Sequence, residues 1–353
     1  MANNTPIQKI IFGSPGTGKS HLIDSHIIPT QLNIKTPEDT IKTVFHPEYS
    51  HGDFIGKLLP ITRHGRVEYR FYEGHFLQAL GQAYKNHITS IEYDKKGNIT
   101  EKNEVRNVVL VIDEINRGNS SAIFGSIFQL LDRDPSGWSS YSISLNEMAF
   151  LKLLELMGIH VLDNNGIEYS LPPHKATKDL SILQKNIDFL KINLETRTIR
   201  IPPNLSIIAT MNTSDNSIYY MDSAFKRRWD WEFIDIESNS INSDGIAFKT
   251  QKEWFDFIKL LNEFIRENHR QIRGIEDKQI GKYFIKEAQV TKSSIQSKLM
   301  FFLWDSVFSR DKSPLSILLY GKDNQDNQDN LITFGDFAAK VDIFIEKIQS
   351  KNV

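Results

Sequence analysis

The sequence of 353 residues contains no cysteine, which excludes disulfides, thiolate metal ligands and cysteine nucleophiles. No apolar run approaches the roughly 20 residues that cross a bilayer as a helix. The N-terminal segment MANNTPIQKI lacks the basic-then-apolar order of a secretion signal. Together these absences predict a soluble, cytoplasmic protein that does not contact a membrane.

An excess of charge of either sign is also missing. The 42 lysines and arginines nearly balance the 44 aspartates and glutamates, so the formal net charge is −2 and no global basic character favours nucleic-acid binding. A local basic patch is still compatible with this balance. The ten histidines show no His-x-x-x-His spacing, so a helix-borne zinc site is not indicated.

A glycine-rich segment matches the phosphate-binding pattern G-x-x-x-x-G-K-[ST] at every fixed position: Gly13, Ser14, Pro15, Gly16, Thr17, Gly18, Lys19 and Ser20. Glycines let the backbone approach phosphate oxygens closely with its N–H groups pointing inward. A strand is expected before the segment and a helix after it, which is the context that the pattern requires. We expect Lys19 to reach the β- and γ-phosphates and the Ser20 hydroxyl to bind Mg²⁺.

Two acids follow a continuous apolar run at Val108–Ile112, which is typical of a strand buried on both faces. We expect Asp113 to hold Mg²⁺, directly or through water, and Glu114 to polarise the attacking water as general base. An acidic pair at an ordinary strand end is the plainer alternative. Because the pair lies downstream of a complete P-loop, we predict hydrolysis of the nucleotide rather than binding alone.

A third apolar segment, Ser206–Met211, predicts another buried strand, which ends at Asn212. An amide at this position can hydrogen-bond the γ-phosphate or the attacking water. Asp215 is a further candidate for nucleotide contact. The alternative is a turn-forming cluster of Asn and Asp residues.

Phosphoryl transfer gains most from an extra cation at the γ-phosphate, often supplied by a neighbouring subunit. Arg117, Arg227 and Arg228 are the candidates for this cation. For each arginine, a surface or structural salt bridge is the alternative.

Strands that alternate with helices, the first of them ending in a P-loop, predict an α/β class with a mostly parallel sheet covered on both faces. Apolar residues at helical spacing near 254–265 and 337–348 indicate a smaller helical domain after a polar linker. We therefore predict an α/β nucleotide-binding domain over residues 1–237, with an insertion at about 138–200, and an α-helical domain over residues 238–353.

Several motifs together resemble the McrB branch of AAA+ proteins, which are the NTPase motors of modification-dependent restriction systems. The resemblance covers roughly residues 8–310. The segments that carry it are Asp113–Asn119 (DEINRGN), Met211–Asp215 (MNTSD), Arg227–Trp229 (RRW), Phe45–Ser50 (FHPEYS) and Ile280–Phe284 (IGKYF).

This resemblance implies a five-stranded sheet in the AAA+ order with an α-helical lid, and a ring, expected to be a hexamer, with nucleotide between subunits. It implies GTP rather than ATP, and an McrC-like nuclease subunit as the partner that cuts DNA. The P-loop begins almost at the N-terminus, so we expect no DNA-reading domain in this chain and only indirect contact with DNA. Asn216 stands where the family usually has arginine, which puts a contact at that position in doubt.

Two other functions share parts of this pattern. A chaperone-like AAA+ remodeller would use the same P-loop and acids, but with ATP and a protein substrate. A nucleotide-gated scaffold would bind without hydrolysis, against which Lys19, Glu114 and Asn212 argue. No Asn-Lys-x-Asp motif for reading guanine is present, so the preference for GTP rests on the resemblance alone.

Overall fold

The computed structural model describes residues 6–93, 99–163, 167–212, 219, 221–235, 243–285, 287–321 and 331–350. The chain divides into two compact units. Unit 1 consists of Met1–Gln8, Ser20–Met211 and Asp215–Met221. Unit 2 consists of Lys9–Lys19, Asn212–Ser214 and Asp222–Val353. The domain boundary predicted between residues 237 and 238 stays a prediction.

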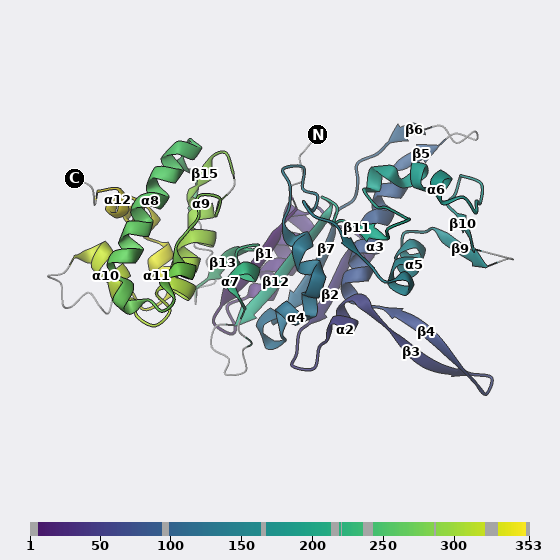
Figure 1. The fold of residues 1–353 in the computed structure, drawn as a ribbon, viewed down its shortest axis with the longest axis horizontal. Coiled ribbons are helices and arrows are strands. Elements are labelled where there is room, and N and C mark those ends of the chain that lie inside the picture. The colour runs from purple at the N-terminus through teal and green to yellow at the C-terminus, as the bar shows by residue number, and fades with distance from the viewer. Residues whose placement is uncertain are drawn as a thin grey trace. The chain divides into compact units, whose positions relative to one another are not determined.

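A five-stranded sheet carries the sequence motifs at its strand ends, in the order β13-β1-β12-β7-β2 (Figure 1). The pairs β1–β13, β12–β7 and β2–β7 are parallel. This confirms the predicted α/β class with a parallel five-stranded sheet. In chain order, the strands are β1 (Gln8–Gly13), β2 (Thr40–Val44), β7 (Val108–Asp113), β12 (Leu205–Asn212) and β13 (Asp230–Ile234).

Helix α3 (His75–Thr89) packs against β2 and β7 within unit 1. The sequence predicts a helix that opens at Gly74 with its apolar residues on one face, and Gly74 precedes α3 in an extended conformation. Its apolar residues recur at three- and four-residue spacing, so they share one face of the helix and are buried. The buried apolar side chains are Phe76, Leu77, Ala79, Leu80, Ala83 and Tyr84.

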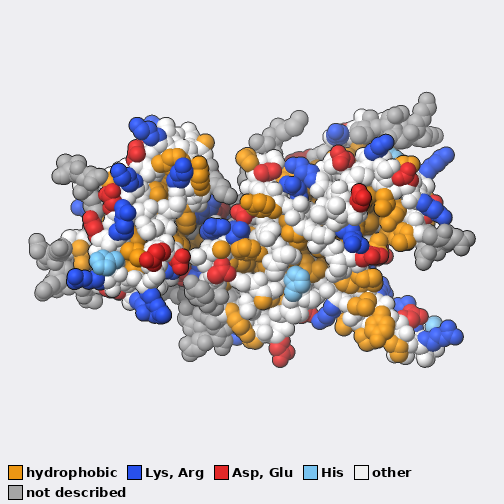
Figure 2. Space-filling view, in the orientation of Figure 1, with side chains coloured by type: hydrophobic (Ala, Val, Ile, Leu, Met, Phe, Trp, Pro, Cys, Tyr) orange, Lys and Arg blue, Asp and Glu red, His pale blue; other side chains and the backbone are white. Residues whose placement is uncertain are grey.

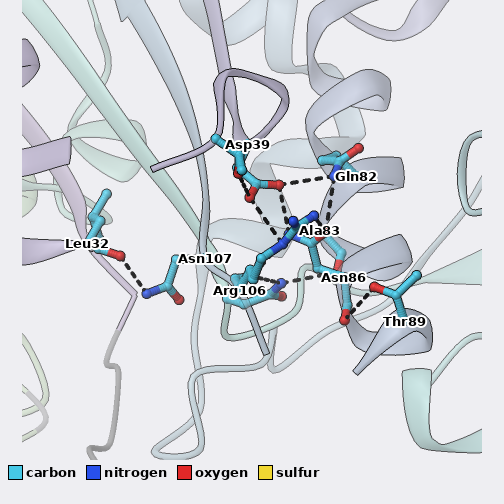
Figure 3. Close-up of polar contacts among 10 residues, drawn as sticks. Leu32, Asp39, Gln82, Ala83, Asn86, Thr89, Arg106 and Asn107 are labelled. Carbon is cyan, nitrogen blue, oxygen red and sulfur yellow. Dashed lines mark hydrogen bonds and ion pairs between the residues drawn. The ribbon is translucent and has the colours of Figure 1, made fainter. Parts of the chain in front are cut away.

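The amino ends of β2 and β7 are tied to α3 by a polar network around a buried carboxylate (Figure 3). Asp39 is 1% exposed, and one of its oxygens accepts hydrogen bonds from the amides of Gln82 at 3.0 Å and Asn86 at 2.9 Å. The other oxygen lies 3.4 Å from the guanidinium of Arg106, which also donates to Asn86 Oδ1 at 3.0 Å. We call Asp39, Gln82, Asn86 and Arg106 the amino-edge network.

Between β2 and α3, a long hairpin projects from unit 1 (Figure 1). Helix α2 (His51–Ile55) leads into its strands β3 (Gly56–Arg63) and β4 (Arg66–Glu73), which pair without interruption along their whole length. The turn residues His64 and Gly65 have φ of 49° and 75°, the left-handed conformations that a two-residue hairpin turn requires. The alternation of residues 67–72 predicts an exposed strand, which β4 confirms, whereas the sequence does not predict β3.

The rest of unit 1 consists of short elements. The sequence of residues 121–131 predicts one continuous helix, which is wrong in one respect: α4 (Ser120–Phe124) ends and a 3-10 helix, η4 (Gly125–Leu131), continues, because Gly125 adopts φ of 51°. The other elements are β5 (Ile91–Tyr93), β6 (Ile99–Lys102), α4 (Ser120–Phe124), β8 (Ile143–Ser144), α5 (Glu147–Leu156), β9 (His160–Asp163), β10 (Ile167–Ser170), α6 (Leu180–Ile187) and β11 (Thr198–Ile199).

Unit 2 joins β1 and β13 to the C-terminal helices through an aromatic cluster. The Phe12 ring lies 5.0–5.8 Å from the rings of Trp231, Phe233, Phe301 and Phe334. A short antiparallel pair, β14 with β15, was not predicted in this helical region. The elements are α7 (Ser223–Lys226), β14 (Ile246–Phe248), α8 (Gln251–Glu267), β15 (Val290–Thr291), α9 (Lys292–Ser294), α10 (Ser313–Tyr320), α11 (Phe334–Ala338) and α12 (Val341–Gln349). Among the described residues, no helix is both long and apolar enough for a membrane crossing.

Candidate nucleotide site

The glycine-rich loop leaves β1 through a position that only glycine can occupy. A Cβ atom on Gly13 would lie 2.3 Å from the carbonyl oxygen of Ile234 on the neighbouring β13, which is closer than any real contact. Gly16 and Gly18 have φ of 81° and 78°, in the left-handed region that other residues rarely adopt. Gly16 has open space around it, so there the backbone conformation rather than crowding requires glycine.

Lys19 bends back over the loop at the start of the helix that begins with α1 (Lys19–Leu22) and continues as the π-helical η1 (Ile23–Gln31). Its Nζ donates hydrogen bonds to the carbonyls of Gly13 at 3.1 Å and Ser14 at 2.8 Å. The Thr17 hydroxyl donates to the same Ser14 carbonyl at 3.0 Å. The loop therefore holds a largely buried ammonium over its own carbonyl oxygens, and anionic phosphate oxygens would be stronger acceptors for it.

The predicted acidic pair lies at the carboxyl end of β7. Asp113 is paired with Val44 of β2, and its carbonyl accepts a hydrogen bond from Phe45 N–H at 2.9 Å. Glu114 follows with φ of 55° and ψ of 48°, a left-handed conformation that costs a residue with a side chain about 1–2 kcal/mol. Such an outlier often marks a functional position. Here it turns the chain sharply out of the sheet directly after Asp113.

Thr210 of β12 makes hydrogen bonds to both Asp113 and Glu114, a role that no motif in the sequence indicates. Its hydroxyl donates to Asp113 Oδ1 at 2.9 Å and lies 3.2 Å from Glu114 N–H, which donates to it. Thr210 is 3% exposed, so this bridge is shielded from water. One buried hydroxyl therefore orients the Asp113 carboxylate and holds the turn at Glu114. A threonine in a strand is ordinary by β-propensity, so only the register of β12 beside β7 identifies it.

Asn212 is the last residue of β12, as predicted, and is half-buried. The following residues 213–218, including Asp215 and Asn216, lie outside the described part of the chain. On the neighbouring turn, the Asn116 carbonyl accepts a hydrogen bond from Tyr219 N–H at 2.8 Å, so the chain returns beside the Asp113–Arg117 turn.

The three candidate arginines occupy two different places. Arg117 ends the 3-10 turn η3 (Ile115–Arg117) in unit 1 and is exposed. Arg227 caps the end of α7 in unit 2 and is also exposed, whereas Arg228 donates to the Ala224 carbonyl at 2.7 Å. Arg228 therefore has a local structural contact, and Arg117 and Arg227 are exposed residues on two different elements.

The oxygen ligands predicted for Mg²⁺ suit that ion chemically, since Mg²⁺ prefers one or two carboxylates together with phosphate oxygens. Asp113 supplies a carboxylate held by Thr210, and Ser20 supplies an exposed hydroxyl. Within the described residues, no group of three or more His, Asp or Glu side chains is arranged to hold a metal by itself. A magnesium ion here would need the nucleotide to complete its coordination.

No family model matches the chain. Among curated proteins, it is 26% identical over 366 residues to component YdiS of the type II restriction enzyme BsuMI from Bacillus subtilis (strain 168), across 95% of this chain and 90% of that protein. It is also 26% identical over 228 residues to the EcoKMcrB subunit of a type IV methyl-directed restriction enzyme from Escherichia coli (strain K12). That match covers 65% of this chain but only 35% of the McrB subunit. These homologues confirm the resemblance carried by the motifs: the chain is related to two restriction-enzyme components, one of them an McrB subunit.

Proposed function

We propose that this chain hydrolyses nucleoside triphosphates, with GTP favoured, as the motor subunit of an McrBC-like restriction complex. The observation that carries the proposal is the strand-end pair Asp113-Glu114, held by the Thr210 hydroxyl in a chain that also has a complete P-loop. In the sheet order, only β12 stands between β1, which leads into that loop, and β7. Parallel sheets bind ligands beyond the carboxyl ends of their strands, so the proposal puts both motifs in one site.

In this proposal the loop binds the phosphates. The backbone N–H groups between Gly13 and Ser20 wrap the β- and γ-phosphates, and Lys19 exchanges its bonds to the Gly13 and Ser14 carbonyls for bonds to phosphate oxygens. Ser20 and Asp113 hold Mg²⁺, which when bound neutralises charge on the phosphate oxygens.

Glu114 acts on the water. Its carboxylate accepts a proton from the attacking water as the new oxygen–phosphorus bond at the γ-phosphoryl group forms and the bond to the leaving nucleoside diphosphate breaks. Asn212, at the end of the adjacent β12, binds the γ-phosphate or the water. Thr210 contacts neither and acts as a positioning residue, because it fixes the two acids relative to each other.

The proposal extends to an assembly. A ring of copies, hexameric as in the McrB branch, would let an exposed cation such as Arg117 or Arg227 reach a nucleotide on the neighbouring copy. An McrC-like nuclease would be the partner that cuts DNA, and this chain would supply the NTP hydrolysis. The relatives' names support membership of a restriction complex; the ring, GTP and the nuclease rest on the resemblance.

Steady-state phosphate release tests this function. The purified chain is assayed with GTP and with ATP in Mg²⁺, with and without any McrC-like nuclease encoded next to its gene. We expect turnover of GTP, little turnover of ATP, and stimulation by the nuclease. Turnover of ATP alone, with no response to the nuclease, would replace the restriction motor by the ATP-dependent remodeller while leaving the nucleotide site in place.

A further inference from the structure

The β3–β4 hairpin sorts its side chains onto two different faces. Residues directly opposite each other in an antiparallel pair share a face, so the register assigns each side chain. One face is mainly apolar and exposed, and the other carries the basic side chains together with the acid Glu68 and with Leu59, Ile61 and Tyr72. The apolar face holds Leu58, Pro60, Val67, Tyr69 and Phe71, and the basic side chains of the other face, which we call the basic face, are Lys57, Arg63, Arg66 and Arg70.

The basic charge is concentrated where the hairpin ends. Arg63 and Arg66 are directly opposite each other beside the turn, and Figure 2 shows basic side chains gathered at the free end of the hairpin. Like charges in opposed positions destabilise a strand pair. No ion pair joins Arg63, Arg66 or Arg70 to another described residue. This repulsion is not offset by an ion pair within the described chain, and an anionic partner would reduce it.

We infer that this hairpin binds the phosphate backbone of duplex DNA through Arg63, Arg66 and Arg70. A planar guanidinium binds phosphate in a bidentate manner, and a two-stranded ribbon fits the major groove. The Arg70 head lies 5.8 Å from the ring centre of Tyr72, which holds it along the basic face. Backbone contact of this kind is weak and independent of sequence, with a Kd of about 10⁻⁴–10⁻⁶ M at physiological salt. The choice of DNA among polyanions rests on the proposed restriction function.

The test is fluorescence anisotropy of a labelled 30-bp duplex titrated with the full chain at several salt concentrations. The variant Arg63→Gln/Arg66→Gln/Arg70→Gln removes only charge, and Arg63→Lys/Arg66→Lys/Arg70→Lys keeps it. A matched control, Lys252→Gln/Lys259→Gln/Arg270→Gln, removes three exposed charges from the region of α8. GTP turnover is measured for each variant, and Lys19→Ala is included in the binding assay.

For wild type we expect binding that weakens steeply with salt. The glutamine variant should lower the slope of log K against log[salt] by about 2.7, which is about 0.9 for each lost phosphate contact. The lysine variant, the α8 control and Lys19→Ala should bind like wild type, and GTP turnover of the hairpin variants should be unchanged.

Absence of wild-type binding at low salt, or an unchanged slope in the glutamine variant, would overturn the inference. Loss of binding on Val67→Thr/Tyr69→Ser alone would do so too, and would make the hairpin an apolar surface for a protein. Failure of GTP hydrolysis with DNA binding intact would count against the proposed function only.

Discussion

Strand β2 of unit 1 has an acidic residue at its amino end and the adjacent strand β7 has two at its carboxyl end, but these acids differ in burial and in hydrogen bonding. At the amino end, Asp39 is buried, and both its oxygens are bound by side chains of the amino-edge network (Figure 3). At the carboxyl end, Asp113 and Glu114 are only half-buried, and Glu114 has a left-handed backbone. The polar groups at the first end stabilise the fold, whereas in the proposed function the second end holds carboxylates for a ligand at the expense of backbone strain.

The difference has a physical cause. A buried carboxylate is tolerated only when its hydrogen bonds are satisfied by the protein, so the network around Asp39 leaves little for a ligand. A catalytic carboxylate must instead exchange partners with water and substrate, so it needs exposure together with a fixed orientation. Thr210 supplies that orientation through one buried hydroxyl. Mutations at the two ends should therefore separate stability from catalysis.

The largest expected effect is at the carboxyl end. Glu114→Gln removes the proposed general base while keeping the shape of the side chain, so kcat for GTP should fall by about 10²–10⁴-fold. Nucleotide binding and the free energy of unfolding should change little. Phosphate release, fluorescent-nucleotide binding and thermal unfolding measure the three quantities. Glu104→Gln, at an exposed position before β7, is the matched control and should be silent. Near-normal turnover of the Glu114 variant would remove this residue from the mechanism.

The amino end should show the opposite separation. Asp39→Ala removes one acceptor of the Gln82 and Asn86 amides and the buried partner of Arg106, so we expect unfolding to become easier by about 2–4 kcal/mol. Turnover per folded molecule should stay within about twofold. Urea unfolding monitored by tryptophan fluorescence gives the free energy, with the exposed Glu38→Ala as control. If Asp39→Ala abolished turnover without loss of stability, the contrast between the two ends would fail.

A pH effect should also come from the amino end. Burial lowers the pKa of His87, on α3, to about 4 from an ordinary value of 6.5. Between these values the unfolded chain takes up a proton that the folded chain does not, so stability is full above pH 6.5 and falls as the pH drops towards 4. The loss should reach about 2 kcal/mol at pH 5. His87→Gln should flatten this part of the profile, and the exposed His269→Gln should leave it unchanged.

A smaller effect on kcat should test the role of Thr210. Thr210→Val keeps the shape but removes the hydroxyl that bridges Asp113 and Glu114, so kcat should fall about tenfold, which corresponds to about 1.4 kcal/mol in the barrier. Thr210→Ser should restore most of the rate. The Mg²⁺ concentration for half-maximal rate should rise in the valine variant, which a purely structural role would not cause. An unchanged magnesium dependence together with a lower melting temperature would reduce Thr210 to a packing residue.

Much of the fold could be predicted because local patterns were strong. The apolar run of β7 and the helical spacing of α3 depend on residues close together in the chain. The hairpin strand β3 was missed because Pro60 and its basic and apolar residues give no clear alternation, and only the pairing with β4 orders them. The short β14–β15 pair was missed for the same reason, since its partners are far apart in sequence.

The candidate site was partly predictable for a related reason. The P-loop and the acids are contiguous motifs, so composition and order identify them. The role of Thr210 depends on the register of β12 against β7, and the left-handed backbone of Glu114 depends on the turn that follows the strand. Neither the register nor the turn conformation is encoded in a short segment. The basic end of the hairpin likewise appears only when Arg63 and Arg66 are paired.

The measurement that tests the central claim most directly is steady-state GTP hydrolysis by wild type and Lys19→Ala in Mg²⁺, with the exposed Lys35→Ala as control. The Lys19 ammonium already lies over the loop carbonyls where phosphate is proposed to bind. We predict that Lys19→Ala abolishes phosphate release while the protein stays folded, and that Lys35→Ala matches wild type. Undiminished release from the Lys19 variant would contradict the assignment of Gly13–Ser20 as the catalytic nucleotide site.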